Sequence, residues 1–254
     1  MVKMNFNIEG NGETIVFIHG LSDNLLYWEP LVAGLKNDYN IIRYDLRGHG
    51  KSELGDDDIS IDLLTDDLKN LLDELGVEKA NLVGFSLGGA ISLDFTVKYP
   101  FRVLSLVLMS TAPCINSHSN EVLDKFSTAI DESFEEFYDF ILPLVLCPDI
   151  IEENREELDL IKEIASASAN NLAIKKAIDA TRKFDIEDKL GEIAAPTLVL
   201  AGKHDGIFLV SQQKEMQENI QSSKLVVFDN VRHNLLVGKN IEKITEILNE
   251  FFKK

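Results

Sequence analysis

The sequence predicts an α/β fold in which a mostly parallel sheet is flanked by helices on both faces. Six short apolar runs, each followed by a turn signal, recur along the chain at residues 14–19, 40–45, 80–85, 103–109, 196–202 and 224–229. Stretches with helical periodicity separate several of these runs. Strands that are apolar along their whole length are typical of a sheet buried on both faces, and their alternation with helices predicts parallel pairing.

The clearest predicted helix lies between the second and third apolar runs. Its apolar face is formed by Ile61, Leu63, Leu64, Leu68, Leu71, Leu72 and Leu75. Ser60 is a suitable N-cap, because its hydroxyl oxygen can accept a hydrogen bond from a free N–H of the first turn. Gly76 provides the stop that commonly follows the last helical residue.

The alternation of strands and helices stops after the fourth apolar run. Apolar residues recur at three- and four-residue steps from Val122 to Ile141, which predicts an amphipathic helix that ends near Pro143. Further helices are predicted over residues 151–165 and 171–183.

This interruption predicts the domain organisation. We expect a core domain formed by residues 1–112 and 191–254, and a helical cap inserted at residues 113–190. A helical insertion between two parts of one sheet usually lies over the strand ends, where open α/β sheets bind ligands.

The charge balance limits the partners. The 254 residues include 25 Lys and Arg against 43 Asp and Glu, a formal net charge of −18. Nucleic acids and anionic membranes bind clusters of basic residues; no such cluster occurs, so neither partner is expected. Residues 113–190 hold 18 acidic and 8 basic residues. The predicted cap is therefore expected to admit neutral substrates more readily than anionic ones.

The rest of the composition predicts a cytoplasmic protein. The first ten residues lack the apolar core of a signal peptide, and no segment reaches the ~18 uninterrupted apolar residues of a spanning helix. Cys114 and Cys147 are too few for a disulfide framework and lack metal-ligand spacing, so no metal site is expected. The sequence leaves the oligomeric state open, including a homodimer.

A candidate nucleophile follows the third apolar run, in the segment Gly84-Phe85-Ser86-Leu87-Gly88. A serine at a sharp turn from a strand into a helix has strained backbone geometry, and glycines two residues before and after it avoid collisions with the turn. The turn lifts the Ser86 hydroxyl clear of the sheet, at a helix N-terminus that favours developing negative charge.

A serine hydroxyl needs a base, and the base needs an acid that orients it. Of the five histidines, His233 follows the last predicted strand, where its loop can reach back over the sheet. Asp205 follows the preceding strand, so that Ser86, Asp205 and His233 occur in the chain order of a nucleophile-elbow triad. Asp229 remains an alternative acid, since a neighbouring strand end could also supply it.

Two backbone N–H groups are candidates for an oxyanion hole. The N–H of Leu87 directly follows the predicted nucleophile. Gly20 permits a sharp turn after the first apolar run, so that the N–H of Leu21 can point at the same oxygen. His19 is expected to brace this loop by hydrogen bonding and not to act as a base.

Together these motifs resemble those of the α/β-hydrolase superfamily, over nearly the whole chain outside the insertion. The resemblance is carried by residues 17–21 (FIHGL), Trp28, residues 44–52 (YDLRGHGKS), residues 84–88 (GFSLG), residues 202–205 and His233. It implies that Asp45, Arg47 and His49 support loop structure near the site. The chain departs from the family's frequent Gly-His pair, because Arg232 precedes His233.

The resemblance implies a serine esterase that needs no metal or organic cofactor. Relatives of this fold with an aspartate nucleophile are excluded by Ser86. We expect a small-molecule ester substrate, small to medium in size and neutral. The alternatives are an enol-lactonase, another lactonase, a thioesterase or a cofactor-free perhydrolase. A non-catalytic ligand-binding receptor on a hydrolase scaffold is the alternative from another class.

Overall fold

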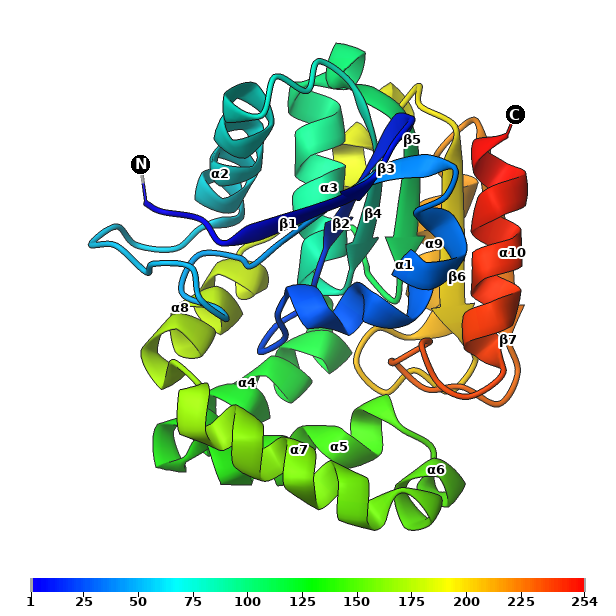
Figure 1. Cartoon of the computed structure of the whole chain (residues 1–254). Helices are drawn as coiled ribbons and strands as arrows, with labels where there is room; N and C mark the ends of the chain where they lie inside the picture. Colours follow the sequence, from blue (N-terminus) through cyan, green and yellow to red (C-terminus); the bar gives the residue numbers. More distant parts are fainter. Residues whose placement is uncertain (1, 254) are drawn as a thin grey trace.

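A seven-stranded sheet forms the centre of the protein in a computed structural model that describes residues 2–253 (Figure 1). The strands are β1 (Phe6–Gly10), β2 (Glu13–Ile18), β3 (Tyr39–Tyr44), β4 (Ala80–Phe85), β5 (Val103–Met109), β6 (Thr197–Gly202) and β7 (Ser223–Phe228), in the order β1-β3-β2-β4-β5-β6-β7. All pairs are parallel except β1 with β3. The predicted α/β fold is confirmed.

Strand β1 is the element that sequence reasoning missed. It pairs antiparallel with β3 at the edge of the sheet, with Ile8 opposite Ile42. Phe6 and Ile8 are 39% and 43% exposed. An edge strand that stays in contact with water does not need a continuous apolar run, so its composition is too polar to stand out.

Helices cover both faces of the sheet, and alternate strand residues face alternate layers. Val16 and Ile18 pack with α2 (Ile61–Glu74), α3 (Leu87–Lys98) and α9 (Val210–Glu218). Ile15 and Phe17 pack on the other face, in a second core cluster with α1 (Glu29–Leu35) and α10 (Asn240–Phe252). The N-cap of α2 is Ser60, whose hydroxyl accepts a hydrogen bond from the Leu63 N–H at 3.1 Å.

The insertion is a group of five helices beyond the ends of the parallel strands (Figure 1). They are α4 (Ser117–Glu132), α5 (Phe134–Val145), α6 (Pro148–Glu153), α7 (Arg155–Ser168) and α8 (Asn171–Arg182). Short 3-10 turns occur elsewhere at Leu25–Trp28, Pro100–Arg102 and Glu187–Glu192. A third apolar cluster joins the insertion to Ile207 and Phe208, which follow β6.

The single helix expected from Val122 to Ile141 is wrong, because the chain breaks at Ser133. Ser133 has an extended φ of −168° and caps α5 by accepting a hydrogen bond from the Glu136 N–H at 3.1 Å. The predicted end near Pro143 is confirmed, since this residue lies within the last turn of α5, which ends at Val145. A second break, at Asn154, divides the helix expected over residues 151–165 into α6 and α7.

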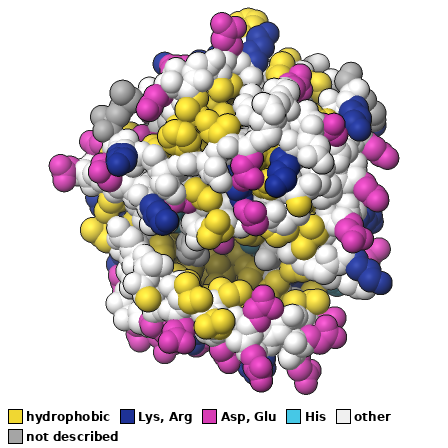
Figure 2. Space-filling view, in the orientation of Figure 1, with side chains coloured by type: hydrophobic (Ala, Val, Ile, Leu, Met, Phe, Trp, Pro, Cys, Tyr) yellow, Lys and Arg dark blue, Asp and Glu magenta, His cyan; other side chains and the backbone are white. Residues whose placement is uncertain are grey.

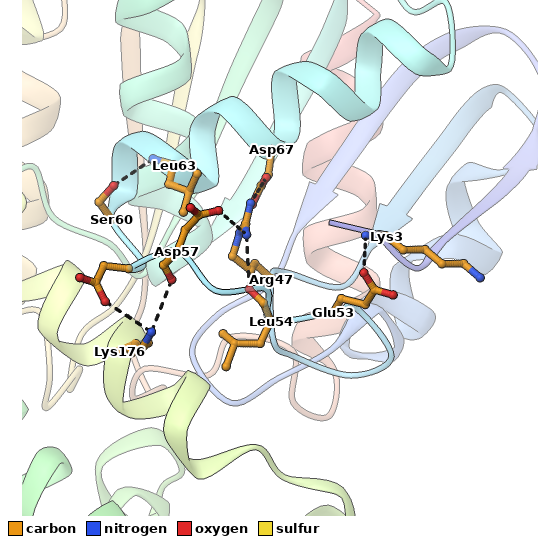
Figure 3. A network of polar contacts seen from close by, with 10 residues as sticks. Lys3, Arg47, Glu53, Leu54, Asp57, Ser60, Leu63, Asp67 and Lys176 are labelled. Atoms are coloured by element: carbon orange, nitrogen blue, oxygen red, sulfur yellow. Dashed lines mark hydrogen bonds and ion pairs between the residues drawn. The ribbon is translucent and has the colours of Figure 1, made fainter. Parts of the chain in front are cut away.

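Charged contacts attach α8 to the core beside the start of α2 (Figure 3). Lys176 of α8 reaches the Asp57 carbonyl oxygen and the Asp58 carboxylate, both at 3.4 Å. Next to this contact, Arg47 forms a two-pronged pair with Asp67 of α2, at 2.7 Å from Nε and 2.6 Å from a terminal nitrogen. Arg47 and Asp67 are buried, whereas Asp58 is fully exposed.

None of the helices within residues 2–253 is both long enough and apolar enough to cross a lipid bilayer.

The buried pair is expected to contribute far more to stability than the exposed one. Asp67→Asn should lower the free energy of unfolding by about 3 kcal/mol, because buried Arg47 keeps only its longer ion pair with the exposed Asp57, at 3.5 Å. Lys176→Ala should have a much smaller effect, because its partner is in water. Urea denaturation of both variants measures the difference, and equal losses would contradict the prediction.

Candidate active site

Ser86 occupies a strained turn between β4 and α3. Its φ of 52° and ψ of −116° lie in a region that residues with a Cβ rarely adopt. The surrounding backbone holds it there: its N–H donates to the Met109 carbonyl at 2.9 Å, and its carbonyl accepts from Gly89 N–H at 2.9 Å and from Thr111 Oγ1 at 2.8 Å. The hydroxyl faces the cavity described below.

Gly84 and Gly88 are required by the close packing of this turn. A Cβ at Gly84 would lie 2.3 Å from the Gly88 carbonyl oxygen, and one at Gly88 would lie 2.0 Å from the Ile18 carbonyl oxygen. Both distances are far below van der Waals contact. The glycines therefore let α3 start directly beside the end of β2.

His233 and Asp205 form a buried pair at the ends of β7 and β6. Nδ1 of His233 lies 3.0 and 2.9 Å from the two carboxylate oxygens of Asp205. The same carboxylate accepts hydrogen bonds from the Ile207 and Phe208 N–H groups at 2.9 and 3.0 Å and from Gln213 Nε2 at 3.2 Å. These donors hold the carboxylate of Asp205 in place beside His233, so that Nδ1 donates to it and Nε2 is the ring nitrogen that can act as a base.

The alternative acid, Asp229, lies elsewhere. Its side chain is 78% exposed and pairs with Lys203 Nζ at 2.8 Å, and this lysine lowers the pKa of the carboxyl. The structure thus brings Asp205, and not Asp229, to His233.

The loop that carries His233 is also attached to the insertion. The Asn234 N–H donates to the Val145 carbonyl at 3.0 Å, and the Arg232 guanidinium donates to the Pro143 carbonyl. Both carbonyls belong to the last turn of α5, where helical carbonyls have no N–H partner within the helix. Arg232 therefore caps α5 and steadies the histidine loop, a role that the sequence did not reveal because the two segments are 89 residues apart.

The loop after β2 places Gly20 and Leu21 beside Ser86. His19 braces this loop, with Nδ1 at 2.8 Å from the Gly20 carbonyl and Nε2 accepting from the Leu46 N–H at 3.0 Å. Burial, followed by the nearby His49, lowers the pKa of His19 to about 3, so it stays neutral. Leu21 and Leu87, the two residues expected to supply oxyanion N–H groups, both line the cavity.

The candidate residues meet at a cavity of about 530 Å³ between the sheet and the insertion. Ser86 and His233 open into it, and most of the wall is apolar. From the insertion the lining includes Leu123, Phe126, Phe134, Tyr138, Ile141, Leu142, Val145, Leu146, Leu158, Ile161, Ala165 and Thr181. Figure 2 shows this hollow lined by hydrophobic side chains. The apolar stripe of α4 and α5 therefore serves two purposes, because Ile130 and Phe137 pack in the interior while others face the cavity.

One carboxyl group in the cavity was not singled out from the sequence. Asp23, in the loop after Leu21, lines the cavity, and its carboxyl has no hydrogen-bonding partner among residues 2–253. Burial raises its pKa to about 7, an effect that the nearby His233 opposes. A lone aspartate in a polar loop gives no signal in the sequence that its carboxyl lies in a cavity.

Comparison with known proteins adds to this geometry. A family model described as the alpha/beta hydrolase fold matches residues 13–239. The chain belongs to the α/β hydrolase family.

Relatives of this hydrolase match it end to end. The 3-oxoadipate enol-lactonase 1 of Acinetobacter baylyi is 27% identical over 263 residues, covering 99% of this chain and 93% of the relative. A protein of Rhizobium rhizogenes named provisionally as the carbamate hydrolase RutD is 29% identical and covers 96% of each chain. The crystal structure of an enol-lactonase from Burkholderia xenovorans LB400 has a TM-score of 0.92 at 26% identity, covering 100% of this chain and 97% of that one. These similarities support hydrolase activity.

The raised pKa of Asp23 makes a prediction about stability and pH. Because the folded protein holds this proton more tightly than the unfolded chain, whose aspartate has the usual value of 3.8, the contribution is complete below about pH 4 and is lost as the pH rises through about 7. Asp23→Asn cannot ionise. The free energy of unfolding of the variant, minus that of the wild type, should therefore be larger at pH 8 than at pH 4.5. Urea denaturation of both proteins at the two pH values measures this change. A constant difference would show that Asp23 ionises as freely in the folded protein as in water.

Proposed function

We propose that this hydrolase cleaves carboxylic esters through an acyl-Ser86 intermediate. The observation that carries the proposal is the buried His233–Asp205 pair, because its histidine lines the same apolar cavity as Ser86. A pure binding protein has no physical need for a serine in strained geometry beside an oriented histidine. The similarity to hydrolases favours an enzyme over a non-catalytic ligand-binding receptor.

In the first half of the reaction, Ser86 Oγ attacks the ester carbonyl carbon while His233 Nε2 takes the hydroxyl proton. Asp205 stays ionised and stabilises the imidazolium. The tetrahedral intermediate collapses, the bond from carbon to the alcohol oxygen breaks, and His233 returns the proton to the leaving alcohol. The acyl group is left on Ser86.

In the second half, His233 removes a proton from a water molecule that attacks the acyl-enzyme. Collapse of this second intermediate breaks the bond to Ser86 Oγ, which recovers its proton from His233. The products are a carboxylic acid and an alcohol, and Ser86 is regenerated.

The N–H groups of Leu21 and Leu87 are the proposed donors to the oxyanion. Leu87 begins α3, and the first N–H groups of a helix lack intrahelical acceptors. Donors held by the backbone do not reorganise as charge develops, and one such donor is typically worth about 10²–10³ in rate.

The cavity is largely apolar and disfavours esters that carry a free carboxylate. Its wall includes no lysine or arginine among the described residues, so a free carboxylate on the substrate would find no counter-charge there. The Acinetobacter relative is named for the enol-lactone of 3-oxoadipate, a compound that keeps one free carboxylate. We therefore propose esters as the first substrate class of this chain and neutral lactones as the second.

The first test is labelling with a fluorophosphonate, which reacts with activated serines. Ser86→Ala should abolish labelling and hydrolysis of 4-nitrophenyl butanoate while leaving thermal stability close to wild type. Labelling that survives in the variant would place the nucleophile elsewhere. Wild-type protein that neither labels nor hydrolyses esters of two to eight acyl carbons would overturn the proposed function.

The second test separates the two candidate acids. Asp205→Asn should lower kcat by about 10³–10⁴, because the amide favours the wrong tautomer of His233. Asp229→Asn should stay within about twofold of the wild type, since its carboxylate lies in water on Lys203. Steady-state kinetics on 4-nitrophenyl butanoate compares them. If Asp229→Asn loses as much activity as Asp205→Asn, the assignment of the acid is wrong.

A further inference from the structure

We propose that Asp23 makes this active site selective for esters that carry a cationic ammonium group. The inference rests on the proposed function and deepens it by naming the substrate class. It follows from the position of one carboxyl group, from the absence of a partner for it in the cavity, and from the charge around the entrance.

The carboxyl of Asp23 is built into the loop beside the proposed oxyanion hole. Its Oδ2 lies close to Gly20, at 3.1 Å from the position that a Cβ there would take, and its backbone N–H approaches the Gly20 carbonyl at 3.4 Å. The residue lines the same cavity as Ser86 and His233. A substrate whose carbonyl sits on Ser86 therefore extends next to this carboxyl.

Apart from His233, no described group in the cavity compensates a charge on Asp23. It is the one acidic residue among the lining residues of the described chain, and no lysine or arginine lines the cavity with it. The titratable groups that face it are His233 and Tyr27. His233 is engaged by Asp205, and the Tyr27 hydroxyl donates to Asn234 Oδ1 at 3.1 Å.

Asp23 is half-buried, and a carboxylate without a partner in a largely apolar cavity is costly. A ligand cation lowers that cost. This cost affects the pKa of two groups. Burial raises the pKa of Asp23 to about 7, and Asp23 adds to the effect of burial that raises the pKa of Tyr27. A bound ammonium group would supply the missing positive charge and hold Asp23 ionised. A bound carboxylate would be repelled.

The surface of the molecule favours the same class of substrate. The chain carries a net charge of −18, and residues 113–190 hold 18 acidic against 8 basic residues. Figure 2 shows Asp and Glu side chains on both sides of the hollow. A negative potential around an apolar cleft concentrates cations at its mouth and raises their association rate.

Matched esters test the proposal. On the acyl side, the 4-nitrophenyl esters of 4-(trimethylammonio)butanoate and 5,5-dimethylhexanoate differ only by nitrogen in place of carbon. On the alcohol side, acetylthiocholine and 3,3-dimethylbutyl thioacetate form the same kind of pair. In at least one pair, the wild type should have a higher kcat/KM for the cationic ester than for the neutral one. Asp23→Asn should lower the ratio of these two kcat/KM values by about tenfold, which corresponds to about 1.4 kcal/mol.

Asp229→Asn is the matched control, because it also removes one negative charge but lies outside the cavity. It should leave the ratio of cationic to neutral ester close to the wild-type value. Equal effects of both variants, abolished by 0.5 M salt, would assign the preference to the surface charge and contradict the role of Asp23. A wild type that prefers the neutral ester in both pairs would also overturn it.

Binding without turnover separates this proposal from the proposed function. Choline and 3,3-dimethylbutan-1-ol are isosteres, and calorimetry on the resting protein should show choline bound more tightly by the wild type and at least about fivefold weaker in Asp23→Asn. Choline that does not bind, or binds both proteins equally, contradicts the proposal even if esters are cleaved. Binding that depends on Asp23 in a protein that cleaves no ester contradicts only the proposed function.

Discussion

The strained turn at Ser86 is the constraint on which the rest of the site depends. A φ of 52° is unfavourable for a residue with a Cβ, and it persists because β4, β5 and α3 all bond to the same short segment. The sheet contributes to holding this turn, because the carbonyl of Met109 at the end of β5 accepts a hydrogen bond from the Ser86 N–H. The same packing brings the end of β2 against Gly88, so the nucleophile and the loop of Leu21 are positioned by one contact.

The insertion completes the site in two ways. Its helices supply most of the apolar wall, so that a hydroxyl and an imidazole at the strand ends face a cavity that excludes much of the solvent. The last turn of α5 also holds the histidine loop through its free carbonyl groups. His233 is therefore held by Asp205 at Nδ1 and, through its loop, by the insertion. A movement of α5 would act on wall and base together.

The charged groups at the surface differ from the carboxyl groups of Asp23 and Asp205 in how far water reaches them. The ionic contacts near α8 and the many acidic surface residues lie largely in water, where each contributes little by itself. Asp205 is buried, whereas Asp23 is half-buried in the cavity. The Asp205 carboxylate receives three hydrogen bonds besides its contact with His233, whereas the Asp23 carboxyl receives none among the described residues. The first is stabilised as an anion by the protein, and the second is left for a ligand to stabilise.

The sequence by itself determined the sheet, the position of the elbow and the order of the candidate triad residues, because apolar strands and glycine turns depend on local residue types. It also determined that the chain contains a helical insertion. The tertiary structure alone decided the edge strand β1, the breaks at Ser133 and Asn154, the contact of Arg232 with α5 and the position of Asp23 in the cavity. Each of these depends on segments that are distant in the sequence, or on whether water reaches a polar group, and neither is encoded in a local pattern.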